Sequence, residues 1–352
     1  MFNLTQTAYW TRRLLKIGAF LLIAIIFLRF SLRLFSSVWQ KLNPPPPPPP
    51  TVSFGKLPVI KFPEKSDSGI KLNYRLETIQ GGLSKLTEIA KVFFIPKEGP
   101  NLLALQRATQ EAKRLGFSSE PQQINETIYR WNNGATPLTT LDININTGNF
   151  HLLYAYENDA EVINSQDLPA NQQAAQEAKN FLDAQGLLTA DLATGSAEFV
   201  YLKYSSPNNL SLATSLSEAD FVRANLFRAD LDGLKILPPN PKNSLISFLF
   251  SGVRTLGRRI VEINYNYYPI ERETFATYPL KNAQTAWQEM QGGKGYIANL
   301  GQNENGNIVI RNVSLAYYDA DQPQNFLQPI YVFEGDNNFI GFVPAVANQW
   351  TE

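Results

Sequence analysis

The sequence predicts an α+β fold in which tandem units, each a helix followed by an antiparallel sheet, come after one N-terminal transmembrane helix. Three observations lead to this prediction: an apolar run near the N-terminus, helical spacing of apolar residues that recurs along the chain, and alternating strands after each helical stretch. Helices that alternate with groups of antiparallel strands are typical of α+β folds, in which the helices cover one face of the sheets.

The apolar run covers residues 17–28, and its twelve residues are fewer than the about 20 that span a bilayer. Apolar residues on both flanks extend it to residues 14–38, and Trp10 and Trp39 lie where interfacial aromatic residues are expected. We therefore expect a short cytoplasmic tail at residues 1–13 and a transmembrane anchor at residues 14–38. An amphipathic helix on the membrane surface and a cleaved signal peptide are the alternatives.

The orientation of this anchor does not follow from its charges, because three basic residues precede the run and three follow it. Residues 51–352 contain no second apolar run of spanning length. A signal anchor with its N-terminus inside is the simplest arrangement. It predicts a single-pass protein of the cell membrane with an extracytoplasmic C-terminal body.

A stiff spacer is expected directly after the anchor. Residues 44–50 are seven consecutive prolines, which form a polyproline II helix rising about 3.1 Å per residue. The whole stretch of residues 39–70 is predicted as a Pro-rich spacer. A ligand for SH3 or WW domains is the alternative.

Two stretches of the body have the same order of elements. Residues 101–116 and 171–186 show helical apolar spacing, and each stretch ends at a glycine suited to a helix C-terminus. Around the turn at residues 147–149, two alternating strands form a hairpin after the first helix. Strands are predicted at residues 127–131, 141–145, 150–156, 197–204, 219–229 and 260–268.

A third, shorter helix is expected at residues 280–291 and is again followed by strands, at residues 308–318, 329–334 and 339–346. We therefore expect a first α+β unit at residues 71–165. A second unit with a C-terminal hairpin is expected at residues 166–352.

The composition excludes several classes of site and partner. The chain has no Cys and one His, which excludes disulfides, thiolate metal sites, Cys nucleophiles and any site that needs two histidines. The 31 basic and 31 acidic residues balance, but six basic residues lie in residues 1–50, which leaves 25 basic and 31 acidic residues in residues 51–352. A body with a net charge of −6 is a poor partner for nucleic acid.

Residue types that often form catalytic, metal-binding or phosphate-binding sites are expected to have structural roles in this sequence. His151 is out of phase with its apolar strand neighbours, so we expect a surface or hydrogen-bonded histidine. Asp319 and Asp321 resemble the start of a calcium loop, but the required Gly and Glu are missing. The glycines at residues 292–295 lack the spacing of a phosphate-binding loop. The sequence therefore predicts no catalytic residues, no metal and no cofactor.

Tyrosines gather on two predicted strands. By strand alternation Tyr265 and Tyr267 share the buried face, which leaves Tyr268 exposed, and Tyr317 is buried while Tyr318 is exposed. Amphipathic tyrosines suit binding surfaces. Tyr268 and Tyr318 are therefore the candidate partner-binding residues, and ordinary strand tyrosines are the alternative.

Residues 219–237 (ADFVRANLFRADLDGLKIL), with the helix at residues 278–297 and the hairpin at residues 326–346, resemble the extracytoplasmic YycH/YycI regulators of a bacterial sensor kinase. A helix followed by a glycine-turn hairpin also resembles the PepSY-type unit. The resemblance extends over residues 100–346 and carries no active-site residues. It implies tandem PepSY-like units and a role exerted by contact with a membrane partner, although the seven prolines depart from the pattern.

The predicted function is thus a non-enzymatic, membrane-tethered extracytoplasmic module that binds or regulates a membrane or envelope protein, such as a sensor kinase, and contacts the bilayer through residues 14–38. The first alternative is a protein that binds cell-wall or surface polymers through its tyrosines. The second is a hydrolase that uses carboxylate pairs such as Glu271 and Glu273.

Overall fold

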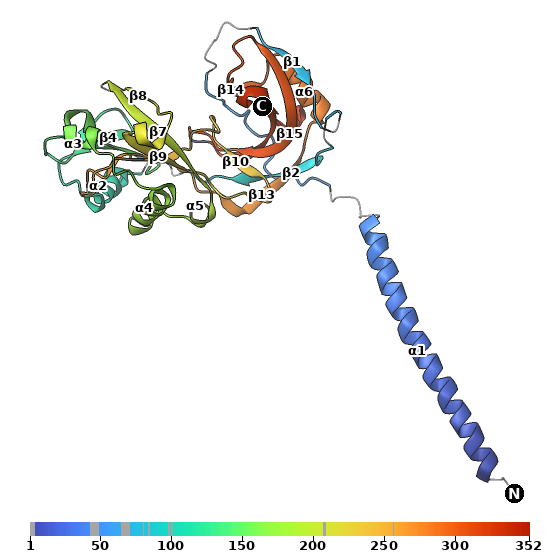
Figure 1. Cartoon of the computed structure of the whole chain (residues 1–352). Coiled ribbons are helices and arrows are strands. Elements are labelled where there is room, and N and C mark those ends of the chain that lie inside the picture. Colours follow the sequence, from blue (N-terminus) through green and yellow to red (C-terminus); the bar gives the residue numbers. More distant parts are fainter. Residues whose placement is uncertain are drawn as a thin grey trace. The chain divides into compact units, whose positions relative to one another are not determined.

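The computed structural model of the chain describes residues 4–42, 49–64, 71–79, 81–83, 85–97, 99, 101–206, 209–255 and 257–352. It consists of two units: residues 1–49, the helix unit, and residues 50–352, the body. Figure 1 shows both units.

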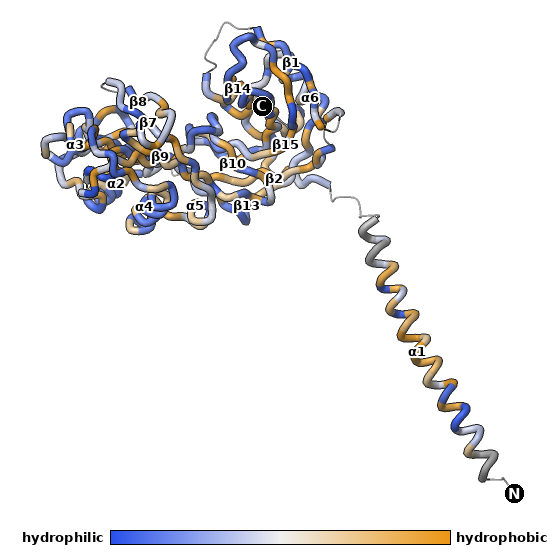
Figure 2. Tube along the Cα trace, in the orientation of Figure 1, coloured by the Kyte–Doolittle hydropathy of each residue, from blue (hydrophilic) through white to orange (hydrophobic). Residues whose placement is uncertain are grey.

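The helix unit contains α1 (Leu4–Leu42). Within it Ala8–Ser36 is long and apolar enough to cross a membrane, and its apolar centre is visible in Figure 2. At about 1.5 Å per residue this stretch extends about 44 Å, more than the about 30 Å of a bilayer core. The predicted apolar helix is confirmed and extends past both ends of residues 14–38. Most of the expected proline helix, residues 44–48, lies outside the described residues.

The first sheet of the body is antiparallel and contains nine strands among the described residues. Its order is β3 (Gln122–Gln123), β4 (Ile128–Asn132), β5 (Thr139–Asn144), β6 (Phe150–Tyr154), β12 (Ile260–Tyr265), β11 (Ile246–Phe250), β9 (Phe221–Leu226), β7 (Ala197–Ser206) and β8 (Asn209–Leu212).

Two helices cover one face of this sheet, α2 (Ala104–Arg114) and α4 (Asn171–Ala184) (Figure 1). Their alanines and Leu182 pack on alternate strand residues, which include the fully buried Trp131 and Phe248. Burial of this apolar stripe against the sheet stabilises both helices. The short helix α3 (Ala160–Asn164) lies over the opposite face, where Val162 packs in an apolar cluster. Helix α5 (Ala190–Thr194) follows α4.

The second sheet has eight strands within the described ranges, and both ends of the body contribute to it. Its central path is β1 (Asn73–Leu76), β15 (Asn307–Tyr318), β16 (Phe326–Gly335), β17 (Phe339–Pro344) and β14 (Tyr296–Asn299); β10 (Lys235–Leu237) also pairs with β15, and β2 (Ile89–Phe94) pairs with β13 (Glu271–Pro279) and β16.

Two strands, β1 and β10, lie parallel to β15, and the other pairs of the second sheet are antiparallel. Helix α6 (Ala283–Gln291) buries Trp287 and Met290 against one face. Ile60 and Phe62 from the N-terminal part of the body pack on the other face. The body is thus α+β with large antiparallel sheets, as predicted.

The three predicted helices of the body and the predicted hairpins are confirmed within a few residues. The sheets, however, do not separate at the expected boundary between residues 165 and 166. Strand β6 pairs with β12 across more than 100 residues of sequence, and the rings of Phe150 and Tyr265 stack at 5.2 Å between these strands. This aromatic contact joins residues from both expected units in one sheet.

Candidate functional site

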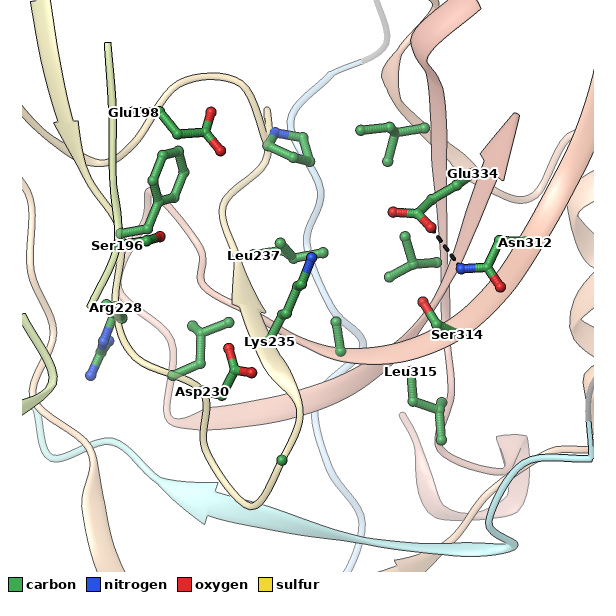
Figure 3. A pocket seen from close by; sticks show the side chains of 17 residues that line it. Ser196, Glu198, Arg228, Asp230, Lys235, Leu237, Asn312, Ser314, Leu315 and Glu334 are labelled. Atoms are coloured by element: carbon green, nitrogen blue, oxygen red, sulfur yellow. Dashed lines mark hydrogen bonds between the residues drawn. The ribbon is translucent and has the colours of Figure 1, made fainter. Parts of the chain in front are cut away.

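A groove of about 520 Å³ lies where the two sheets meet (Figure 3). We call it the junction groove. Strands β15, β16 and β17 form one wall, and the other is formed by the start of β7 and the segment that follows β9. Its lining includes Glu198, Asp230, Lys235, Asn312, Val332 and Glu334.

The wall on the second sheet follows from strand register. Asn312 pairs with Glu334 and Ser314 with Val332, so these side chains lie on one face of β15 and β16. The Asn312 side chain donates to Glu334 at 2.8 Å. Ala316, Val332 and Ile340 continue the same face as an apolar floor. The groove therefore has an apolar base and a polar rim.

Lys235 is the basic group at the centre of this rim. It is exposed on β10 and extends between Glu198 on one side and Glu334 on the other (Figure 3). Within the described part of the chain, the Lys235 ammonium and the carboxylates of Glu198 and Asp230 have no ion pair or side-chain hydrogen bond. These charges are free to meet a partner.

Arg228 lines the groove and is buried. Its Nε donates to Asp191 at 2.7 Å, its guanidinium lies 4.5 Å from the ring centre of Tyr267, and its NH1 donates to Asp319 at 3.4 Å. Asp191 belongs to α5, whereas Asp319 directly follows β15. Arg228 therefore ties the first sheet to the second and holds the groove walls in place.

The two aspartates have opposite pKa shifts. Burial raises the pKa of Asp319, and its contact with Arg228 does not compensate. Burial alone would also raise the pKa of Asp191, but the charge of Arg228 and hydrogen bonds from Thr189, Arg228 and Tyr267 hold that pKa below its ordinary value.

The predicted contact residue Tyr268 is half-buried, and burial raises the pKa of its hydroxyl to about 12. It lies outside the junction groove, and its part in binding stays a prediction. Tyr265 and Tyr317 are buried, as expected, whereas Tyr267, which was also expected to be buried, is half-buried.

The expectation that Tyr318 is exposed is wrong, since its exposed fraction is 0%. The alternation on β15 is present, but both faces of the strand are covered. The ring of Phe62 lies 4.8 Å from that of Tyr318, and Phe342 lies beyond it at 6.3 Å. A buried ring is not available to a partner, so Tyr318 is not proposed as a contact.

The remaining candidates have structural roles. His151 is half-exposed, and its Nε2 lies 3.3 Å from a carboxylate oxygen of Glu262, as expected for a hydrogen-bonded histidine. The glycines after α6 end that helix, with Gly293 in the left-handed region. No group of three or more His, Asp or Glu that could hold a metal occurs among the described residues.

The groove residues were missed in the sequence because they come from five strands and three loops. One signal was present. Arg228 continues the period-two pattern of the buried residues Val222, Ala224 and Leu226, so alternation places a charge at an inward position. Such a charge requires a buried partner.

No protein-family model matches the chain, and no curated protein matches it. Among solved structures, it is similar to an uncharacterized protein from Eubacterium rectale, with 13% identity, a TM-score of 0.39, and coverage of 78% of this chain and 87% of that chain. It is also similar to the C-terminal domain of YpeB from Bacillus megaterium, with 13% identity, a TM-score of 0.32, and coverage of 72% and 95%. Similarity at this distance assigns neither a family nor a function.

Proposed function

We propose that the protein is a membrane-tethered extracytoplasmic module that binds and regulates a membrane or envelope protein and has no enzymatic activity of its own. In this proposal α1 is a single-pass anchor with its N-terminus inside, and the body lies outside the membrane. The length and apolar composition of Ala8–Ser36 support the anchor.

The observation that carries the proposal is the junction groove. An apolar floor surrounded by a polar rim is the usual anatomy of a protein–protein interface. The free charges of Lys235, Glu198 and Asp230 add mixed charge to this rim, which favours a specific protein partner with complementary charges.

We also propose that the body is built from tandem PepSY-like units and acts as YycH/YycI regulators do, on a partner such as a sensor kinase. The resemblance over residues 100–346 supports this proposal. The order of elements also supports it, because strands follow each of the helices α2, α4 and α6.

The test is recovery of the partner from gently solubilised membranes with the full-length chain as bait. Reversing the charge in Lys235→Glu should lower recovery of the co-purifying membrane protein about fivefold or more, because charged pairs at an interface are sensitive to reversal. The matched control is Lys113→Glu on the exposed end of α2, which should leave recovery unchanged. Equal recovery with both variants would contradict the assignment of the groove.

Orientation has a separate test. Protease added to intact cells should remove the body and leave a small membrane-bound fragment. Cleavage only after lysis would place the body inside and contradict the extracytoplasmic assignment.

A further inference from the structure

A second groove, of about 380 Å³, lies over the ends of β5, β6 and β12. We call it the amide groove, and its polar lining includes Asn144, Asn149, Asn264, Asn266, Tyr268 and Gln322. It shares no lining residue with the junction groove.

Strand register produces the floor of the amide groove. Asp142 on β5 pairs with His151 on β6, which pairs with Asn264 on β12, so three polar side chains form one row across the sheet. Their neighbours Leu141 and Ile263 point into the helix-covered core. The groove therefore lies on the face opposite to α2 and α4.

The charges on this floor already have partners. Asp142 accepts two hydrogen bonds from Arg130, both at 2.6 Å. Glu262, beside the row, is paired with His151 and with Arg223. Of the acids that line the groove, only Asp321 has no ion pair in the described part of the chain. The groove is therefore strongly polar but carries little net charge.

Part of the amide set is fixed in orientation. Asn149 donates to Asn266 at 2.7 Å, and Asn266 donates to the main-chain oxygen of Asp321 at 2.8 Å. The oxygen of the Asn149 side chain accepts from the main-chain nitrogen of Tyr267 at 3.0 Å. A ligand would meet side chains that are already ordered, which lowers the entropy cost of binding.

Other polar atoms remain available. Asn144 uses its side-chain oxygen to cap the turn at Asn146 and Thr147, and Asn264 uses its side-chain nitrogen on Glu262. The other polar atom of each amide, and the whole Gln322 amide, make no side-chain hydrogen bond within the described ranges. Both donors and acceptors are therefore left over, and a hydroxyl group can satisfy either kind.

We propose that the amide groove binds a neutral oligosaccharide. Its volume lies within the range of small-molecule sites, but such sites are mostly apolar, whereas this one is lined by amides. Hydroxyl-rich ligands match it because they exchange hydrogen bonds with amides and need no counter-charge. The half-buried ring of Tyr268 supplies an apolar surface at the edge, with its hydroxyl 3.4 Å from the main-chain oxygen of Asp321.

The test uses the full-length chain in a detergent without a sugar headgroup. Chitotetraose, cellotetraose and maltotetraose are the neutral probes, and tetragalacturonate is the anionic probe. Binding is measured by saturation-transfer NMR and calorimetric titration. At least one neutral probe should bind, and tetragalacturonate should bind more weakly.

Two variants locate the binding. Gln322→Ala, on an exposed loop, should weaken binding of the neutral probe about threefold to tenfold, the scale of one lost hydrogen bond. Tyr268→Ala should weaken it at least as much. The matched control is Gln173→Ala on the exposed side of α4, which should leave binding unchanged.

Three results would overturn the proposal. They are the absence of binding by all three neutral probes at millimolar concentration, binding that Gln322→Ala and Tyr268→Ala leave unchanged, and preference for tetragalacturonate. Each outcome is independent of the partner-recovery experiment, because that experiment alters only the junction groove.

Discussion

At the scale of single residues, two aspartates share the guanidinium of Arg228 in different surroundings. Asp191 makes a 2.7 Å hydrogen bond to it and also accepts from Thr189 and Tyr267. Asp319 has only long contacts of 3.4 and 3.5 Å to Arg228. Asp191 is therefore the main counter-ion of a buried arginine, and Asp319 is an incompletely compensated buried carboxylate.

Replacing either aspartate should separate these roles. Asp191→Asn should lower the free energy of unfolding by about 3 to 5 kcal/mol, because a buried arginine loses its main partner. Asp319→Asn should leave stability at pH 7 unchanged or higher, because one arginine and one carboxylate remain. Chemical denaturation of the full-length chain measures both, and a larger loss in Asp319→Asn would show that the roles are reversed.

The pH dependence follows from the raised pKa of Asp319. The folded protein keeps the Asp319 proton to higher pH than the unfolded chain, in which an aspartate has a pKa of about 3.9. The stabilisation of the folded state by this proton is therefore complete below the unfolded pKa and is lost as the pH rises through the folded pKa. Thermal melts should show the advantage of Asp319→Asn over the wild type growing from about pH 4 to pH 7. A constant difference across this range would contradict a raised pKa.

At the scale of one element, α6 shows how a local signal and tertiary packing combine. Asn282 precedes its first turn, and the side-chain oxygen accepts from the main-chain nitrogen of Thr285 at 2.7 Å. The ring of Trp287 then packs 5.8 Å from Phe333 on β16. The cap sets where the helix begins, and burial on the second sheet keeps it folded.

Removing this cap has a predictable cost. Asn282→Ala should lower the free energy of unfolding by about 1 kcal/mol, and Asn282→Ser should retain most of the stability because serine also caps. Urea denaturation of the two variants beside the wild type measures the difference. The same loss in both would mean that the side chain acts through another contact.

At the scale of the whole molecule, the second sheet depends on the N-terminal part of the body. Strand β2 inserts beside β13 and β16, and its residues Val92 and Phe93 are 0% and 1% exposed. Before it, the main chain of Val52 donates to Thr277 at 3.0 Å. The N-terminal part of the body therefore completes the second sheet through contacts with β13 and β16, far along the chain.

Truncation tests this dependence. The fragment of residues 50–352 should be soluble and melt cooperatively, because it retains β1, β2 and the contact at Val52. The fragment of residues 96–352 should aggregate or lose its cooperative melt, because β13 and β16 then expose apolar strand surface. Circular dichroism and size-exclusion chromatography report both outcomes. A cooperative melt of the shorter fragment would show that the second sheet does not need β1 and β2.

The sequence by itself determined the features that depend on neighbours within about ten residues. These are the apolar helix, the helices α2, α4 and α6 with their stop signals, and the hairpin of β5 and β6, at whose turn Gly148 has a φ of 75°. Helical and strand periods are local patterns, so they can be read directly. Strand β11 has no such pattern, because all five of its residues are buried. The sequence therefore did not predict it.

Only the tertiary structure decided which strands pair and what becomes exposed. The partners of β1 and β2 lie about 200 residues further along the chain, and no local pattern identifies them. Tyr318 obeys the period of its strand but is buried, because Phe62 covers the face that alternation leaves free. Lys235 and Glu334 line one groove for the same reason: long-range burial of apolar surface, and not the order of residues along the chain, brings their strands together.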